Sequence, residues 1–426
     1  MLIRFPRCAA LIATLALALR PVQAQHDMHD MSSMDSDSGW NASGGAQAIA
    51  LVTRVDPARQ GRALTEGYVA QPMLMGHLMG PRMSTLNARL TLGGTLNFEG
   101  VTMSRGELNP GASGEGYVDR RHPHTLFHEA FATLESERSV ATSLTIGKGF
   151  ASYGSDDPMV RGFALFPANH HLAQILERAI VVGAIRWRRA ALEATLFNGD
   201  EPEGPYDWPN ANHFFDSHAV RGTLWLGKWF EWQGSGAFVK SPENAFGGGL
   251  SQRKVSTSLR FAESERVNFI RSPYALIEWA RNDDMSGSRL AFRYSTLLGE
   301  GGATLGNFVT LLRLERTTRP EDERQLDPFR SPRPQADNSI LGITRFSTVT
   351  AHLELSRPIA RLMRPFFEAS YSAVSPTLPG SLFNPAVEVF GSDRLWTVSA
   401  GMRLSVGSQH SRMGRYGVAQ LVSQMN

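Results

Sequence analysis

Histidine and methionine gather near the start of the chain, where their side chains offer ligands for a soft metal ion. Residues 25 to 47 read QHDMHDMSSMDSDSGWNASGGAQ. Imidazole and thioether groups are ligands that copper accepts, and thioethers favour Cu(I). The candidate ligands are His26, Met28, His29, Met31 and Met34. We interpret them as a copper-binding tail, and the alternative is a low-complexity solvated segment that binds no metal.

A second cluster of the same side chains follows in PMLMGHLMGPRM, residues 72 to 83. Side chains alternate between the two faces of an extended strand, so every second residue shares a face. One such face carries Met73, Met75, His77 and Met79. Methionine also fills irregular apolar gaps, so a metal-binding stripe and ordinary packing remain alternatives here.

A third group contains histidines and acids around the sequence HPHTLFHE. Its members are Asp119, His122, His124, His128 and Glu129, with His170 and His171 in a later polar stretch. The spacing is neither HExxH nor a complete hydrolytic metal motif. We favour structural pairing of these side chains with carboxylates, and a hydrolase that uses His122, His124 and His128 is the alternative.

Other chemistry is not indicated. The sequence has no GxSxG elbow, no Walker loop and no dinucleotide fingerprint. We therefore expect no enzyme and no required cofactor, with copper as the candidate bound ion.

The first 24 residues have the layout of a secretory signal peptide. Arg4 and Arg7 precede the apolar run AALIATLALAL, and Val22-Gln23-Ala24 fits a cleavage site after Ala24. Cys8, the single cysteine, would leave with this segment. The formal net charge of +3 also disappears, because the segment holds three arginines and no acid. A mature chain without net charge gives no reason to expect nucleic-acid binding.

Beyond the polar tail, apolar and polar residues alternate in segments of roughly ten residues. Examples are RAALEATLFNG, HAVRGTLWLG and RLWTVSAGMRLSVG. A period of two residues is typical of strands with one apolar and one polar face. Charged residues make up only 19% of the chain, and Gly and Pro number 40 and 23, which excludes a coiled coil or collagen. The pattern predicts an all-β protein rich in turns.

Very short connections alternate with long polar ones along the predicted strands. Arg188-Arg189 is a short example, and the long stretches are 104–124, 152–173, 200–216, 241–251, 318–338 and 376–393. This rhythm is typical of an outer-membrane barrel with short periplasmic turns and long outside loops. We predict one transmembrane antiparallel barrel of about fourteen strands, with twelve to sixteen possible, both termini being periplasmic.

The predicted division of the chain is a signal peptide at 1–24, a disordered tail and linker at 25–63, the barrel at 64–406 and a tail at 407–426. The segment around residues 64 to 80 lies outside the fourteen counted strands, so we expect it on the periplasmic side or entering the lumen. There His77 would avoid the cost of facing hydrocarbon without a partner.

Four stretches give the chain a family resemblance. They are GEGYVDRRHPHTLFHEAF, GKGFASYGSDDPM, NHHLAQILERA and LFNGDEPEGPYDWPN. Together they resemble a group of Gram-negative outer-membrane porin-like proteins, which are similar in barrel layout to phosphate-selective porins. The resemblance implies a channel and an association with copper-handling systems.

Three classes of function follow. The leading hypothesis is an outer-membrane channel involved in copper or metal tolerance or traffic. The alternatives are a non-conducting barrel that binds metal or a partner, and a barrel or secreted hydrolase. Expected partners are outer-membrane lipid, the barrel-assembly machinery, copper ions and further copies of the chain.

Overall fold

A computed structural model provides the structure of the protein. It describes residues 39–59, 61–85, 87–102, 124–136, 138–202, 205–240, 242, 249–263, 270–322, 340–359, 362–378, 381–407 and 412–420. The signal peptide, most of the His/Met tail, Asp119 and His122 lie outside these residues.

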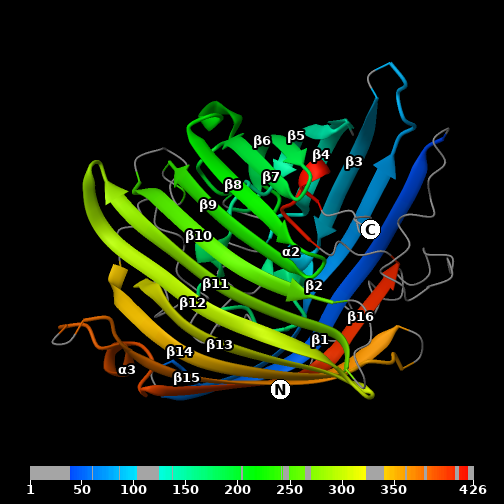
Figure 1. The fold of residues 1–426 in the computed structure, drawn as a ribbon. Helices are drawn as coiled ribbons and strands as arrows, with labels where there is room; N and C mark the ends of the chain where they lie inside the picture. Colours follow the sequence, from blue (N-terminus) through cyan, green and yellow to red (C-terminus); the bar gives the residue numbers. More distant parts are fainter. Residues whose placement is uncertain are drawn as a thin grey trace.

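Sixteen antiparallel strands form one closed barrel within the described residues (Figure 1). The strands of the first half are β1 (Asn41–Arg59), β2 (Arg62–Met79), β3 (Ala88–Asn97), β4 (Phe127–Ser136), β5 (Val140–Gly149), β6 (Arg178–Trp187), β7 (Ala190–Phe197) and β8 (Ser217–Leu226). Those of the second half are β9 (Phe230–Val239), β10 (Ser251–Ala262), β11 (Ile270–Ser286), β12 (Arg289–Leu305), β13 (Phe308–Asp322), β14 (Ile340–Leu355), β15 (Met363–Pro376) and β16 (Arg394–Gly407). Each strand pairs with its neighbours in sequence, and β1 pairs with β16 to close the ring.

The strand count corrects the sequence prediction of about fourteen. Both β1 and β2 begin before residue 64, in the stretch expected to be tail and linker. The first residues of β1 read NASGGAQ, and such small polar residues hide the two-residue period. They nevertheless belong to the wall, because Gly45 pairs with Gly407 and Met75 on the two neighbouring strands.

The wall has an apolar outer face and a polar inner face. In β7, Leu192 and Leu196 are exposed to 53% and 45%, whereas Glu193 and Thr195 between them are almost completely buried. The same alternation is clear in strands such as β5, β8 and β16, whereas β2 contains a run of buried residues. A closed sheet satisfies the backbone hydrogen bonds of every strand, so a barrel of this kind suits a membrane.

The two ends of the barrel differ in their connections. At the end where β1 starts and β16 stops, strands are joined by short segments such as 188–189 and 306–307. At the opposite end most connections are long, the exceptions being β1–β2 and β11–β12. The longest that the structure describes throughout is 150–177, between β5 and β6.

Helices are short in the described part of the chain, and none is long and apolar enough to cross a membrane. They are α2 (Glu99–Thr102), α3 (Pro385–Glu388) and the 3-10 helices η2 (Pro158–Val160), η3 (His170–Ala173), η4 (Ala211–His213) and η6 (Gly417–Ala419).

Two segments that are not strands fill much of the barrel interior. Residues 150–177 contribute Ala164 to an apolar cluster with β1, β2 and β15, and Ala168 to another with Phe346 of β14. Near the end of the chain, η6 packs against β4, β5, β6 and β7, where Figure 1 shows it in red. The core of this protein therefore lies inside the barrel.

Candidate functional site: the barrel interior

The β5–β6 connection crosses the lumen from one wall to the opposite one. Near its start, the Gly154 backbone N–H donates to Ser235 Oγ of β9 at 2.9 Å. Further along, the Leu165 N–H donates to Glu368 Oε1 of β15 at 2.6 Å. Gly154 has a φ of +72°, and an added Cβ would lie 1.7 Å from a backbone oxygen, so only glycine fits there.

Ion pairs fix the middle of this connection. The Arg161 guanidinium donates to Glu278 of β11 at 3.1 Å and lies 3.7 Å from Glu300 of β12. From the wall, Arg313 donates to the Leu165 carbonyl at 2.7 Å and to Glu300 at 2.8 Å. The connection is thus held by charged side chains of the second half of the barrel, and it narrows the lumen.

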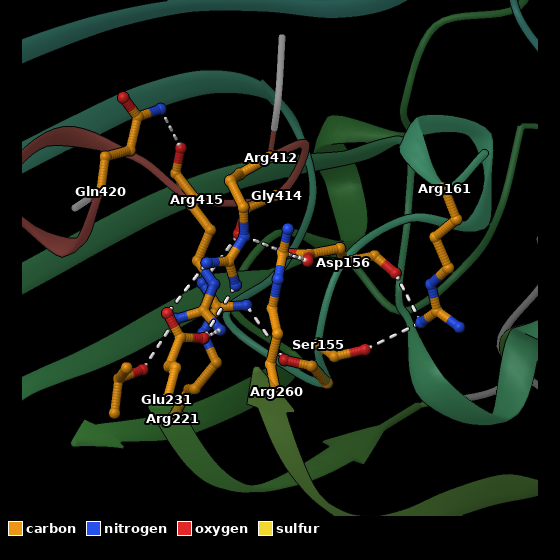
Figure 2. A network of polar contacts seen from close by, with 12 residues as sticks. Ser155, Asp156, Arg161, Arg221, Glu231, Arg260, Arg412, Gly414, Arg415 and Gln420 are labelled. Atoms are coloured by element: carbon orange, nitrogen blue, oxygen red, sulfur yellow. Dashed lines mark hydrogen bonds and ion pairs between the residues drawn. The ribbon is translucent and has the colours of Figure 1, made fainter. Parts of the chain in front are cut away.

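The segment 412–420 lies inside the barrel. Arg412 donates to both carboxylate oxygens of Glu231 in β9 at 2.8 Å and also pairs with Asp156 (Figure 2). Arg415 reaches the same Glu231 at 3.1 Å and donates to Thr223 Oγ1 of β8 at 2.7 Å. The C-terminal segment, the β5–β6 connection and the wall therefore share one buried charge network.

Several further contacts secure the segment to the wall. Arg221 of β8 donates to Glu193 at 2.6 and 2.7 Å and to the Gly414 carbonyl at 2.7 Å. The Tyr416 hydroxyl donates to Glu129 at 2.8 Å and accepts from the Phe150 N–H at 2.8 Å. Sequence analysis predicted only a tail at 407–426, whereas residues 412–420 are built into the interior.

Burial and charge pull the pKa of Asp156 in opposite directions. Burial alone would raise it, but the neighbouring Arg412 and Arg260 guanidinium groups outweigh this effect and hold the pKa below its usual value. Asp156 is therefore ionised near neutral pH, which keeps both ion pairs charged.

The histidine cluster of the sequence is partly assembled at the long-connection end. His124 Nδ1 lies 2.6 Å from Glu99 of α2, and His128 Nδ1 lies 2.6 Å from Glu177, the last residue of the β5–β6 connection. The two imidazole rings are 4.9 Å apart. Burial alone would lower the pKa of His124, but the Glu99 carboxylate outweighs it and raises the pKa to about 9.

His170 and His171 do not join this cluster. They belong to η3, which contacts β10, β11 and β12. Glu129 lies near His128 and bonds to Tyr416 and Thr95. Among the residues that the structure describes, no group of three or more His, Cys, Asp or Glu side chains is arranged to hold a metal ion.

The methionine stripe of β2 faces the barrel interior. Met73 and Met75 are buried, whereas Leu78 on the other face is exposed. Met73 packs with Phe150 and Met413 in one apolar cluster, and the His77 ring lies 6.2 Å from that of Phe131. Residues 72–79 belong to strand β2 of the wall, so the predicted position of this segment on the periplasmic side or within the lumen is wrong. The predicted orientation of Met73 and Met75 away from lipid agrees with their burial, and the metal role stays a prediction. All five predicted ligands of the tail, from His26 to Met34, lie outside the described residues.

Sequence analysis missed the charged inner wall. Four pairs illustrate it: Arg221–Glu193, Arg313–Glu300, Arg319–Glu321 and Arg403–Glu354, at 2.6 to 2.9 Å. Their signal was present in the stretch TLLRLERTTR, where Arg313, Glu315 and Arg319 share one face with Thr317, opposite Leu312 and Leu314. Period-two charge opposite a period-two apolar face indicates a polar lumen.

No protein-family model and no curated protein sequence matches this chain. Solved structures do. The trimer form of OmpT, an outer membrane protein of Vibrio cholerae, has a TM-score of 0.51 and 10% identity, covering 87% of this chain and 100% of that one. A loop L8 deletion mutant of OmpT has a TM-score of 0.50 and 8% identity, covering 87% and 100%. The anion-selective porin from Comamonas acidovorans has a TM-score of 0.49 and 8% identity, covering 86% and 100%.

The two likenesses to OmpT concern the fold alone, and they agree with the closed barrel. They give no support to a link with copper. The chain has the porin-like barrel fold of outer-membrane proteins.

Proposed function

We propose that this protein is a weakly selective channel of the outer membrane, whose lumen is narrowed by residues 150–177 and obstructed by residues 412–420. The observation that carries the proposal is the two-faced wall: apolar residues outside and charged residues inside a closed barrel. Such a wall favours lipid on one side and hydrated solutes on the other. We propose no enzymatic activity for it.

Weak selectivity follows from the composition of the inner wall. Buried arginines there stand next to glutamates, as in Arg313–Glu300 and Arg403–Glu354. A lumen that presents guanidinium and carboxylate side by side gives neither cations nor anions a continuous path of opposite charge. Small hydrated solutes of either sign are the class that such a path would pass.

The C-terminal segment sets the conductance in this proposal. It is held by Glu231, Arg221 and Glu129, which belong to three different strands. While it stays in place, it occupies the interior beside β4–β9. We therefore expect low conductance from the full-length mature protein and a larger one when the segment is absent.

Planar-bilayer recording tests this. The mature protein is compared with a variant that ends at Gly407, and a variant lacking residues 25–38 is the matched control for terminal deletion. We expect the C-terminal deletion alone to raise the unit conductance severalfold. Retained heat-modifiable mobility shows that the variants are folded. If none of the folded proteins conducts, the barrel is a non-conducting binding protein instead.

A metal-handling role is the second candidate, and the inward orientation of Met73 and Met75 favours it. Thioethers that face the interior and a His/Met tail at the N-terminus would offer exchangeable sites for Cu(I). Copper remains a proposal, tested by the binding experiment in the Discussion.

A further inference from the structure

Four arginines point outward from neighbouring strands of the barrel: Arg253 of β10, Arg281 of β11, Arg293 of β12 and Arg316 of β13. We call them the arginine patch. Residues beside them in sequence point inward and are buried, among them Lys254, Asn282, Tyr294 and Glu315. The side chains of Arg281 and Arg293 are exposed to 39% and 51%.

The arginine patch lies at one edge of the apolar outer face. Val255, Trp279 and Leu314 lie two positions from Arg253, Arg281 and Arg316, toward the other end of each strand. They are exposed on the same side of the sheet as these arginines. Arg253, Arg281 and Arg293 lie within five residues of the strand ends at the end of the barrel where most connections are long, and Arg316 lies six residues before the end of β13. Along each of these strands, the outer surface thus changes from apolar to cationic over a few residues.

Asp283 lies at the centre of the arginine patch. It pairs in register with Arg253 on one side and Arg293 on the other. The Arg293 guanidinium donates to both of its carboxylate oxygens, at 2.7 and 3.1 Å, and Arg281 pairs with it as well. One carboxylate among four guanidinium groups leaves an excess of positive charge.

The strands that adjoin β10 on its other side, β5 to β9, have no such feature. The structure describes every residue of β5–β9, and no exposed residue on these strands is arginine, lysine, aspartate or glutamate. Their exposed positions carry apolar residues such as Ile146 and Leu196. A general need for solubility would also place charged residues on β5–β9, so the arginine patch has a local cause.

We propose that the arginine patch binds the phosphate groups of an anionic membrane lipid whose acyl chains cover the adjoining apolar face. This inference rests on the membrane location in the proposed function. Guanidinium groups recognise phosphate through paired hydrogen bonds, which makes arginine well suited to this task. The apolar surface directly below selects a lipid over free phosphate, because acyl chains gain contact there.

Native mass spectrometry of the full mature protein, titrated with diphosphorylated lipid A in detergent, tests the proposal. The first variant carries R253Q, R281Q, R293Q and R316Q. Its matched control carries R189Q, K228Q, R271Q and R357Q, four changes of the same charge near the opposite end. We expect the patch variant to lose lipid affinity by roughly tenfold or more and the control to retain it.

Asp283→Asn provides a change of opposite sign. Removing the carboxylate frees Arg281 and Arg293 for the ligand, so we expect tighter binding of lipid A. Dephosphorylated lipid A should bind weakly to all variants, and inorganic phosphate should not compete at millimolar concentration. Equal loss in the patch and control variants, or unchanged binding in the patch variant, overturns the proposal. Bilayer conductance should be the same in the patch variant and in the wild type. A failure of the lipid-binding proposal is therefore distinguishable from a failure of the proposed channel function.

Discussion

Arg412 and Glu231 are 181 positions apart in the sequence, yet their side chains are joined by two hydrogen bonds of 2.8 Å inside the barrel. The pair connects the C-terminal segment to β9. Glu231 also accepts from Arg415 and from the Trp225 indole N–H. One carboxylate therefore anchors the end of the chain to the wall.

Replacing this carboxylate should release the segment. In Glu231→Gln, Arg412 and Arg415 each lose one charged partner inside the barrel, which we expect to lower the free energy of unfolding by about 3 kcal/mol. Chemical unfolding in detergent measures the loss. Asp393→Asn, an exposed position, is the control. A stability equal to that of the control would mean that the network does not hold the segment.

The β5–β6 connection should depend on Glu368 in the same way. This carboxylate accepts the backbone N–H groups of Ala164 and Leu165 and pairs with His352. Glu368→Ala leaves two amides without their acceptor, so we expect a less ordered connection and noisier single-channel current. Hydrogen exchange of residues 160–170 provides the structural measurement. Unchanged exchange would show that other contacts are sufficient to keep the β5–β6 connection ordered.

The pairing of His124 with Glu99 predicts a dependence on alkaline pH. The pKa of His124 is raised from 6.5 to about 9, against the effect of burial, by Glu99 and by the more distant Glu177 and Asp157. A raised histidine pKa contributes stability that is complete below pH 6.5 and is lost as the pH rises through about 9. We expect the midpoint of thermal unfolding to fall across this window.

His124→Gln should remove the His124 contribution to that dependence. Its unfolding midpoint should be lower than that of the wild type at pH 6, and the two should converge above pH 9. A wild-type midpoint that is flat from pH 6.5 to 9, or equally steep in His124→Gln, would contradict the assignment.

Copper binding by the N-terminal tail remains a prediction. Calorimetry under reducing conditions should detect Cu(I) bound to the mature protein. Binding should be lost when His26, Met28, His29, Met31 and Met34 are replaced together. Met73→Leu and Met75→Leu then separate a contribution of the β2 stripe, since leucine retains the packing without the thioether. Equal affinity after the five replacements would identify the tail as a solvated spacer.

The strand pattern was predictable from the sequence because it is local. Alternation in RAALEATLF identifies β7, and it assigns Leu192 and Glu193 to opposite faces without any other part of the chain. The same logic failed for β1. Its glycines and small polar residues carry no period, and pairing with β16 and β2 fixes them in the wall.

The interior network was not predictable, because its partners are distant in the sequence. Alternation places Glu368 inside the barrel, but nothing local indicates that it accepts the Leu165 N–H, 203 positions away. Likewise, SRMGRYGVAQ reads as a short basic tail. The acids that hold Arg412 and Arg415 belong to segments with no sequence relation to that tail.

Single-cysteine labelling in lipid vesicles tests most directly whether this barrel spans a membrane with its apolar face outward. Cys8 lies in the predicted signal peptide, so the mature protein provides a background without thiols. We expect Leu196→Cys, Leu259→Cys and Leu314→Cys to react with a lipid-soluble maleimide and to resist a charged, water-soluble one. Rapid reaction of all three with the water-soluble reagent in the folded protein would contradict the account.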